Sequence, residues 1–220
     1  MLIACWSTKG GAGTTVVAAS LGLLLARTCP SGAAAVDLAG DLPAALGMAP
    51  GDPSEPGVAG WLAAAPDVPP DAMARLERSS GSGLGVVPRG RGPLPPGQAG
   101  LLASLLAEDV RPIVADCGRI DGPDADAAVT VAASANRSLL VLRPCYLALR
   151  RAIDAPIRPS GLVLLVEEGR AITGGDVEEA IGVPVLARVR VTDTVARAVD
   201  AGLLASHLPR TLARDLRHVA

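Results

Sequence analysis

The sequence has few aromatic residues: among its 220 residues there are no Phe, one Tyr and two Trp. Proteins that bind single-stranded nucleic acid commonly stack the bases on exposed aromatic rings. Tyr146, Trp6 and Trp61 are too few to form such a surface or an aromatic ligand cage. Neither kind of binding site is therefore expected.

An excess of charge of one sign is also missing. The 20 Lys and Arg residues nearly balance the 22 Asp and Glu residues, so the net charge is −2. This balance gives no global basic field that would attract nucleic acid, although a basic patch on one face remains compatible with it.

Long hydrophobic runs are absent, although 50% of the residues are hydrophobic. Residues 16–26 form the longest nearly apolar run, well short of the ~20 residues that a membrane-spanning helix needs. The first residues, MLIAC, lack the basic segment that opens a secretory signal. We therefore expect a cytoplasmic protein.

The four cysteines lie far apart, without the close spacing of metal-binding motifs. They are Cys5, Cys29, Cys117 and Cys145. We expect small buried thiols in a reducing compartment rather than disulfides or metal ligands.

Short strand-like runs alternate with longer helix-like runs along the chain, which is typical of βα units around a buried parallel sheet. Strands are predicted over 2–7, 34–37, 84–88, 112–116, 138–142, 161–166 and 184–190. Helices are predicted over 14–27, 41–47, 57–65, 71–78, 97–107, 123–133, 146–153, 174–181, 193–201 and 209–218. The pattern predicts one α/β domain over residues 1–220, with a mainly parallel, doubly wound sheet of about seven strands flanked by helices.

A glycine-rich loop, STKGGAGTTV over residues 7–16, follows the first predicted strand and leads into an apolar helix. Glycines let the backbone wrap closely around phosphates, while the N–H groups and the positive end of the helix face the negative charge. The hydroxyl of Thr15 stands where phosphate-binding loops hold Mg²⁺. The loop therefore predicts an anion site for a phosphorylated ligand.

Lys9 is the only lysine in the chain, and it lies in this loop. A compact ammonium bridges phosphate oxygens as a point charge, which the planar arginine fork does less flexibly. A dinucleotide site is the nearest alternative, with Gly11 and Gly13 after a strand and Asp37 as the ribose-binding acid. The third glycine of that fingerprint is replaced by Val16, which disfavours it.

The loop resembles that of the deviant Walker A P-loop ATPases of the ParA/MinD family, in which it reads KGGxGKTT, whereas this chain reads KGGAGTTV. The likeness continues in VDLAGD, with Asp37 at the first acid of the family's D-x-D motif, and in RPIVADCG, where Asp116 resembles the Walker B acid. The resemblance implies a P-loop fold, ATP and Mg²⁺ as cofactors, and a nucleotide-dependent homodimer.

The resemblance also implies roles for individual residues. Lys9 would reach the partner's phosphates and, with Asp37, serve catalysis. Mg²⁺ would be held by Thr15, Asp37 and Asp116, in part through water. The nucleotide-binding residues would be Lys9, Gly10, Gly11, Ala12, Gly13, Thr14, Thr15 and Val16.

Two departures from the family pattern bear on hydrolysis. Thr14 replaces the lysine that holds phosphates in its own subunit, and Ala39 replaces the second acid of the D-x-D motif. Asp41 is interpreted either as a stand-in for that acid or as the N-cap of the helix over residues 42–46. ATP hydrolysis is therefore expected to be weak or absent.

Base recognition departs from the pattern too, because Glu167 and Glu168 stand where many relatives carry an adenine-reading Asn.

Within the family, the chain looks most like the TadZ/CpaE branch, through the segments KGGAGTT, VDLAGDLPAALGM and LRPCYLALRRA. That branch helps to place Tad/Flp type IV pilus machines, so a protein of such a system is the implied partner. Contact with DNA through Arg89 and Arg91, or through Arg143, Arg150 and Arg151, is an open alternative to solvated arginines. For residues 210–219 we favour a final helix packed on the sheet over one that binds the inner face of the membrane.

The resemblance implies a nucleotide-dependent dimeric switch that positions a cellular machine. The alternative is a scaffold without enzymatic activity that keeps the fold for protein interactions. A metabolic P-loop enzyme is a third reading, but the sequence shows no second substrate site.

Overall fold

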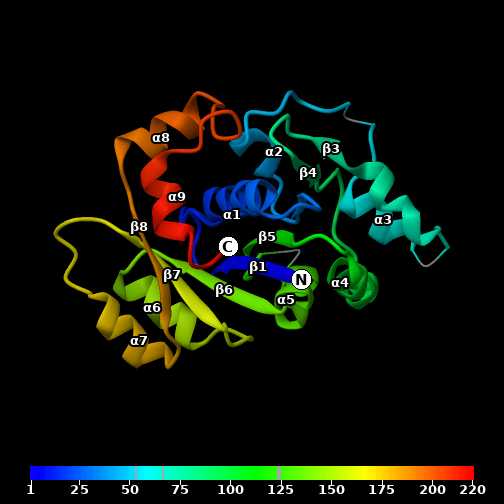
Figure 1. The fold of residues 1–220 in the computed structure, drawn as a ribbon. Coiled ribbons are helices and arrows are strands. Elements are labelled where there is room, and N and C mark those ends of the chain that lie inside the picture. Colours follow the sequence, from blue (N-terminus) through cyan, green and yellow to red (C-terminus); the bar gives the residue numbers. More distant parts are fainter. Residues whose placement is uncertain (53, 66, 123–124) are drawn as a thin grey trace.

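A sheet sandwiched between two layers of helices forms the body of the molecule, as the computed structural model shows (Figure 1). The structure describes residues 1–52, 54–65, 67–122 and 125–220. The strand order is β3-β4-β2-β5-β1-β6-β7-β8, and all neighbours run parallel except β3 and β4. The chain thus starts in the centre of the sheet and later builds outward on both sides.

The strands are β1 (Leu2–Ser7), β2 (Ala33–Asp37), β3 (Arg78–Ser79), β4 (Leu84–Val87), β5 (Ile113–Arg119), β6 (Arg137–Leu142), β7 (Gly161–Val166) and β8 (Val185–Arg190). The α-helices are α1 (Thr14–Thr28), α2 (Leu42–Ala45), α3 (Val58–Ala64), α4 (Ala99–Glu108), α5 (Ala125–Ser134), α6 (Tyr146–Ile153), α7 (Gly174–Ile181), α8 (Asp193–Asp200) and α9 (Arg210–Leu216). The short 3-10 helices in the described ranges are η1 (Pro70–Ala72), η2 (Ala74–Leu76) and η3 (Pro96–Gln98).

The predicted α/β architecture is confirmed, with one strand more than expected. The prediction of a single helix over 71–78 is wrong, because η1, η2 and then β3 occupy this stretch. Arg78 pairs antiparallel with Val86 of β4, and Glu77 forms an ion pair with Arg111 at 2.9 Å. These long-range contacts, invisible to helical periodicity, extend the chain at residues 78–79.

Strand β5 also runs further than predicted, to Arg119 instead of residue 116. A bulge lies where β5 pairs with β1: Cys5 is opposite Asp116, whereas Trp6 is opposite Gly118 and Ser7 is opposite Arg119. Bulges of this kind redirect side chains at the end of a strand. Here the bulge brings the residues after Asp116 beside the start of the glycine-rich loop.

The two faces of the sheet bury separate hydrophobic cores. Helices α1, α2, α8 and α9 cover one face, and α4, α5, α6 and α7 cover the other (Figure 1). On α9, Leu212 and Leu216 are almost fully buried, which confirms that the final helix packs on the fold. Burial of one such side chain stabilises a fold by roughly 1.5–3 kcal/mol.

All four cysteines are free thiols; Cys5 and Cys117 are buried as predicted, whereas Cys29 and Cys145 are partly exposed, contrary to the prediction of buried thiols. Among the described residues, no helix is long and apolar enough to cross a membrane.

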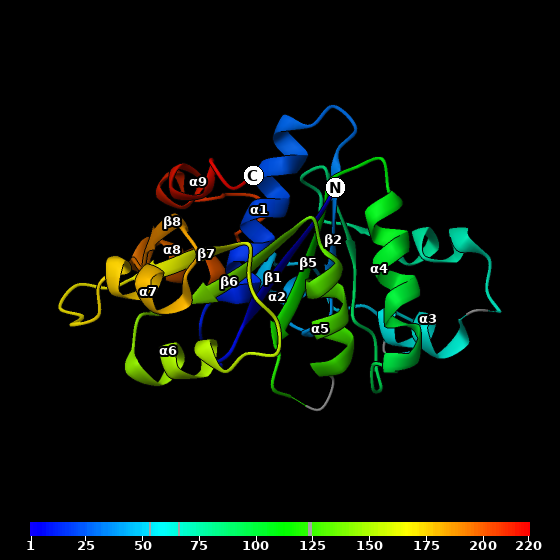
Figure 2. The same ribbon diagram turned by 90° about the horizontal axis from the view of Figure 1, so that it is seen from below.

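The glycine-rich loop lies at one end of the parallel strands, and both chain termini lie at the opposite end (Figure 2). Strand β1 runs from the N-terminus to the loop, and α1 returns along the sheet toward the edge where both termini lie. The carboxyl ends of the parallel strands therefore gather around the loop, which is where open α/β sheets bind their ligands.

Candidate functional site

The glycine-rich loop joins β1 to α1 in a conformation that its glycines make possible. Gly11 and Gly13 have φ values of 73° and 84°, in the left-handed region that favours glycine. A Cβ atom on Gly13 would also overlap the side chain of Leu165 on β7. No side chain caps the start of α1, so the first-turn N–H groups remain available to an anion.

The loop forms one wall of a cavity of about 490 Å³. The other walls come from the ends of β2 and β5 and from the segments that follow β4 and β5. The lining residues are Ser7, Gly10, Gly11, Ala12, Gly13, Thr14, Thr15, Val16, Leu38, Ala39, Asp41, Arg89, Cys117, Gly118, Arg119, Gly122 and Ala128. All loop residues predicted to bind nucleotide except Lys9 thus face one hollow, hereafter the phosphate cavity.

Asp37 is fully buried at the end of β2, and both of its carboxylate oxygens accept backbone hydrogen bonds. Oδ1 accepts from the N–H groups of Ala39 at 2.9 Å and Gly40 at 2.7 Å, and Oδ2 accepts from Leu42 at 3.2 Å. These bonds fix the turn between β2 and α2. They favour a role in shaping the cavity wall, while metal ligation or catalysis by Asp37 stays a prediction.

Asp116 is equally buried, but it is much less satisfied. Its Oδ1 accepts a hydrogen bond from the N–H of Gly118 at 3.1 Å, whereas Oδ2 has no hydrogen-bond partner among the described residues. Asp116 and Asp37 are register partners on the adjacent strands β5 and β2. Two carboxyl groups therefore lie side by side within the protein interior.

The surroundings raise the pKa of both carboxyl groups. Burial raises the pKa of Asp37 to about 6, although the N–H groups of the β2–α2 turn act in the opposite direction. Burial, and next the charge of Asp37, raise the pKa of Asp116 to about 7, while the hydroxyl of Thr15 and the N–H of Gly118 oppose this rise. A cation near Asp116 would relieve both the desolvation and the repulsion.

Thr15 and Asp116 fit a Mg²⁺ ion that also binds a phosphorylated ligand. Thr15 lines the phosphate cavity, and the unpartnered Oδ2 of Asp116 is a hard oxygen donor just behind it. Mg²⁺ prefers oxygen ligands, keeps several waters, and is usually held by one or two protein groups plus phosphates. The described residues contain no cluster of three acidic, His or Cys ligands, so phosphate and water would have to complete the shell.

Lys9 lies on the other side of the loop from the phosphate cavity. It lines a small neighbouring hollow together with Arg143 and Ala148. In the described part of the chain, no carboxylate forms an ion pair with Lys9. Its ammonium group is therefore free to meet a charge outside this subunit.

The two departures from the family pattern occupy the phosphate cavity itself. Thr14 lines the cavity with an uncharged side chain, and Ala39 lines it with a methyl group. Ala39 packs against the end of β5, since a Cβ on Gly118 would lie 2.7 Å from the Ala39 Cβ. This part of the wall thus lacks both the expected cation and the expected acid.

Asp41 precedes α2, at the N-cap position that the sequence suggested, but its side chain makes no capping hydrogen bond. The N–H of Leu42, the first residue of α2, donates to Asp37. The Asp41 carboxylate lines the phosphate cavity.

Glu167 lies after β7 and is held between two arginines. Its carboxylate pairs with Arg143 at 2.8 Å and also with Arg170. Glu167 is thereby committed to an ion-pair network.

A second, mostly apolar cavity of about 180 Å³ adjoins the loop at Gly13 and Val16. Its walls come from the ends of β7 and β8 and from α8, including Leu165, Val189 and Val195. Gly13 therefore separates a hollow that contains charged side chains from a mostly apolar one, an arrangement that suits a ligand with a phosphate chain and a flat ring.

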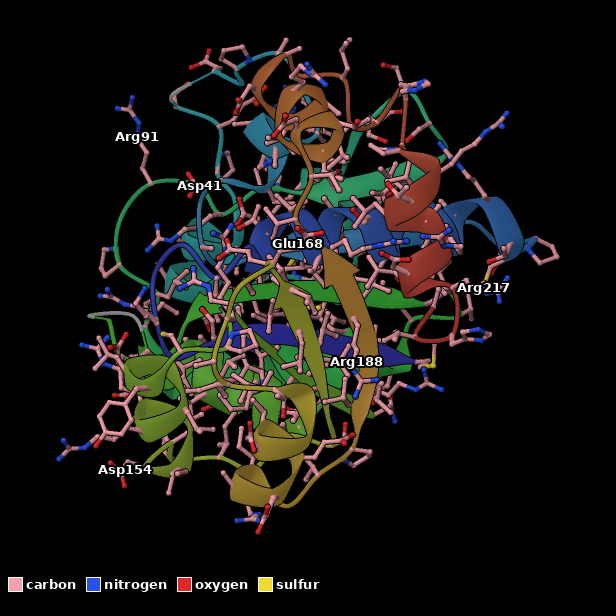
Figure 3. The ribbon with its side chains drawn as sticks, turned by 90° about the vertical axis from the view of Figure 1, so that its left-hand side faces the viewer. Asp41, Arg91, Asp154, Glu168, Arg188 and Arg217 are labelled. Carbon is pink, nitrogen blue, oxygen red and sulfur yellow. The ribbon has the colours of Figure 1, made fainter. Side chains whose placement is uncertain are left out.

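Several arginines that the sequence suggested as basic patches have contacts within the chain. Arg89 lines the phosphate cavity, whereas Arg91 projects away from the body of the molecule (Figure 3). Arg143 pairs with Glu167, and Arg151 lies 3.8 Å from Asp121.

Sequence reasoning missed Arg119 as a site residue. It lines the phosphate cavity because β5 continues three residues beyond Asp116 and pairs Arg119 with Ser7. The only signal in the sequence was its position shortly after the Walker B-like strand.

No family model matches this chain, and no curated protein matches it. Among solved structures, the ParA family ATPase from Chlorobium tepidum TLS matches with a TM-score of 0.79 and 20% identity, covering 98% of this chain and 96% of that one. The septum site-determining protein MinD from Pyrococcus horikoshii OT3, complexed with Mg-ADP, matches with a TM-score of 0.77 and 20% identity, covering 97% and 91%. The Pyrococcus furiosus cell division ATPase MinD matches with a TM-score of 0.76 and 22% identity, covering 100% and 99%. The chain therefore has the fold of the ParA and MinD ATPases over almost its entire length.

Proposed function

We propose that this protein is a ParA/MinD-type switch that binds Mg-ATP, forms a homodimer while the nucleotide is bound, and positions a cellular machine. The observation that carries this proposal is the phosphate cavity, which an uncapped helix start and two left-handed glycines line, with the buried Asp116 carboxylate behind Thr15. The related fold of a MinD that binds Mg-ADP supports the same ligand class.

Each part of the site has a task in this function. The N–H groups of the loop and of the first turn of α1 bind the phosphates. Thr15 and Asp116 hold Mg²⁺, which when bound neutralises charge on the phosphate oxygens. Asp37 keeps the wall between β2 and α2 in shape through its three backbone hydrogen bonds. The apolar cavity beyond Gly13 receives the base.

Hydrolysis is slow in this proposal. Ala39 supplies no carboxylate that would orient an attacking water, and Thr14 supplies no charge to the transferred phosphoryl group. Binding and dimerisation do not need either group.

Lys9 makes the switch dimeric. Its unpaired ammonium lies outside the phosphate cavity of its own subunit, so its charge is available to the phosphates of a partner. The partner system we propose is a Tad/Flp pilus machine of the TadZ/CpaE type, supported by KGGAGTT, VDLAGDLPAALGM and LRPCYLALRRA. Pilus genes beside the gene for this chain would support that assignment, and their consistent absence from related genomes would contradict it.

Sedimentation velocity with and without Mg-ATP tests the switch. The wild-type protein should shift from monomer to dimer on adding Mg-ATP, and Lys9→Ala should stay monomeric. Arg27→Ala is the matched control, because Arg27 is an exposed cation in the last turn of α1, roughly 20 Å along the helix from the loop at 1.5 Å per residue. The control should dimerise like the wild type.

A scaffold without nucleotide chemistry is the competing function, favoured by Thr14 and Ala39. It predicts an oligomeric state that Mg-ATP does not change, together with no detectable nucleotide binding. Dimerisation of Lys9→Ala at wild-type strength would leave the switch in place and remove Lys9 from its bridging role.

A further inference from the structure

The phosphate cavity has an unusual set of charged side chains. Among the residues that the structure describes, the charged ones lining it are Asp41, Arg89 and Arg119, and Lys9 is not one of them. Thr14 occupies the position where a lysine of the same subunit would be expected. A phosphate chain in this cavity would therefore meet arginine as the cation of its own subunit.

Arg119 is placed directly opposite the phosphate-binding loop. Its backbone pairs in register with Ser7, the last residue of β1. Its Nη1 atom lies 4.0 Å from the point that a Cβ on Gly10 would occupy, so the guanidinium overhangs the loop. An anion bound to the loop N–H groups would lie within reach of this side chain.

The present partner of Arg119 is weakly bound. Arg119 forms an ion pair with Asp121, in which both side chains are about half exposed, at 48% and 46%. The other oxygen of Asp121 lies 3.8 Å from Arg151, whose Nη1 is 3.5 Å from the carbonyl oxygen of Thr8. Exposed ion pairs contribute little to stability, so Arg119 can exchange the carboxylate for a phosphate at small cost.

Arg89, the other arginine of the cavity, is held more firmly by hydrogen bonds to its own loop. Its Nη1 donates to the carbonyl oxygens of Gly92 at 2.8 Å and Gly90 at 3.3 Å, which ties it to its own loop. It stands at the wall near Gly40 rather than over the glycine-rich loop. Of the two, Arg119 has the geometry and the freedom to bind a phosphate chain.

We propose that Arg119, held over the loop by Asp121, binds the phosphate chain of the nucleotide and takes the place of the lysine that is missing at Thr14. The planar guanidinium offers two parallel donors to phosphate oxygens, which supplies both charge and direction. This inference rests on the proposed nucleotide binding, and it assigns the cation within the subunit that Lys9 does not provide.

Titration calorimetry of Mg-ATP binding to wild type, Arg119→Gln and Arg91→Gln tests the inference. Arg119→Gln should weaken binding about tenfold to a hundredfold, the range for losing a hydrogen bond from a charged donor. Arg91→Gln is the matched control, since Arg91 projects away from the molecule (Figure 3) and does not line the cavity. It should bind within about twofold of the wild type.

A rescue variant separates a specific role from general electrostatics. Thr14→Lys in the Arg119→Gln background restores a cation to the same cavity, and it should recover most of the lost affinity. Circular dichroism checks that the variant is folded. A folded double variant that binds as weakly as Arg119→Gln would contradict the idea that the two positions serve the same phosphates.

The outcomes distinguish this inference from the proposed function. If the wild type binds Mg-ATP and Arg119→Gln binds equally well, the role of Arg119 is overturned and the switch stands. Equal losses in Arg119→Gln and Arg91→Gln overturn it as well, because net charge alone then explains them. If the wild type binds no Mg-ATP, both the switch and the role of Arg119 fail.

Discussion

The ends of β2 and β5 are neighbours in the sheet, and each carries a fully buried aspartate, yet the two ends differ in how they treat the carboxylate. Three backbone N–H groups satisfy Asp37, and only one satisfies Asp116. Both carboxylate oxygens of Asp37 accept hydrogen bonds, whereas Oδ2 of Asp116 has no hydrogen-bond partner among the described residues.

The path of the backbone after a strand therefore determines how many N–H groups reach a buried carboxylate, and so whether that carboxylate remains available to a cation. After Asp37 the chain turns into α2, so successive N–H groups point back at the carboxylate. After Asp116 the strand continues to Arg119 through a bulge, so only the N–H of Gly118 reaches the carboxylate. The same residue type thus shapes the site in one place and remains available to a cation in the other.

Replacing Asp116 should produce the largest effect on the apo protein. Asp116→Asn removes a carboxylate whose pKa rises from 3.8 to about 7 on folding. Because the folded state holds the proton more tightly, wild-type stability falls as pH rises through this window. At pH 8 the variant should be more stable than wild type by on the order of 4 kcal/mol, at about 1.4 kcal/mol per pKa unit, and the gain should vanish near pH 4.

Urea unfolding at several pH values, without Mg²⁺ or nucleotide, measures this gain. A variant that is less stable than wild type at pH 8 would mean that Asp116 is better satisfied than its contacts indicate.

A bulkier residue at Gly118 should disturb both strand ends. Gly118 has a φ of 57°, and a Cβ there would lie 2.7 Å from the Ala39 Cβ. Gly118→Ala should therefore cost about 2–3 kcal/mol, from the left-handed backbone and the overpacking together. Adding Ala39→Gly should recover the packing part only, and thermal unfolding of the four proteins in the cycle measures the coupling. Simple additivity would show that the two ends do not touch.

Truncating each aspartate tests the contrast directly. Asp37→Ala leaves three N–H groups without an acceptor, and Asp116→Ala leaves one. Asp37→Ala should be the less stable variant by about 2 kcal/mol, since each intramolecular hydrogen bond contributes about 1 kcal/mol. Urea midpoints at one pH give the comparison. Equal stabilities would remove the distinction between the two strand ends.

The smallest effect is expected at Asp41. Its side chain makes no capping hydrogen bond to the first turn of α2. Asp41→Ala should change the unfolding free energy by no more than about 0.5 kcal/mol, as is usual for surface positions away from specific contacts. A loss near 1 kcal/mol in thermal unfolding, typical of a lost N-cap, would show that Asp41 does cap α2.

Most of the architecture could be predicted because it follows from patterns of neighbouring residues along the chain. The alternation of apolar runs predicts seven of the strands within a few residues, since strands buried on both faces must be apolar throughout. The loop over residues 7–16 could be predicted as well, because a backbone that approaches phosphates closely needs glycine at particular positions. β3 was missed because its two residues are extended only through pairing with β4.

By itself, the sequence determined the α/β class, the glycine-rich loop and the positions of both buried aspartates. Only the tertiary structure decided which of these carboxylates keeps a free oxygen and that Arg119 faces the loop while Lys9 lies outside the phosphate cavity. Local patterns report the secondary structure and burial that each segment favours, which depend on neighbouring residues along the chain. The unpartnered Oδ2 of Asp116 and the guanidinium of Arg119 above the loop instead depend on the bulge between β1 and β5 and on the turn after β2. At both places, contacts between residues far apart in the sequence determine where the side chains point.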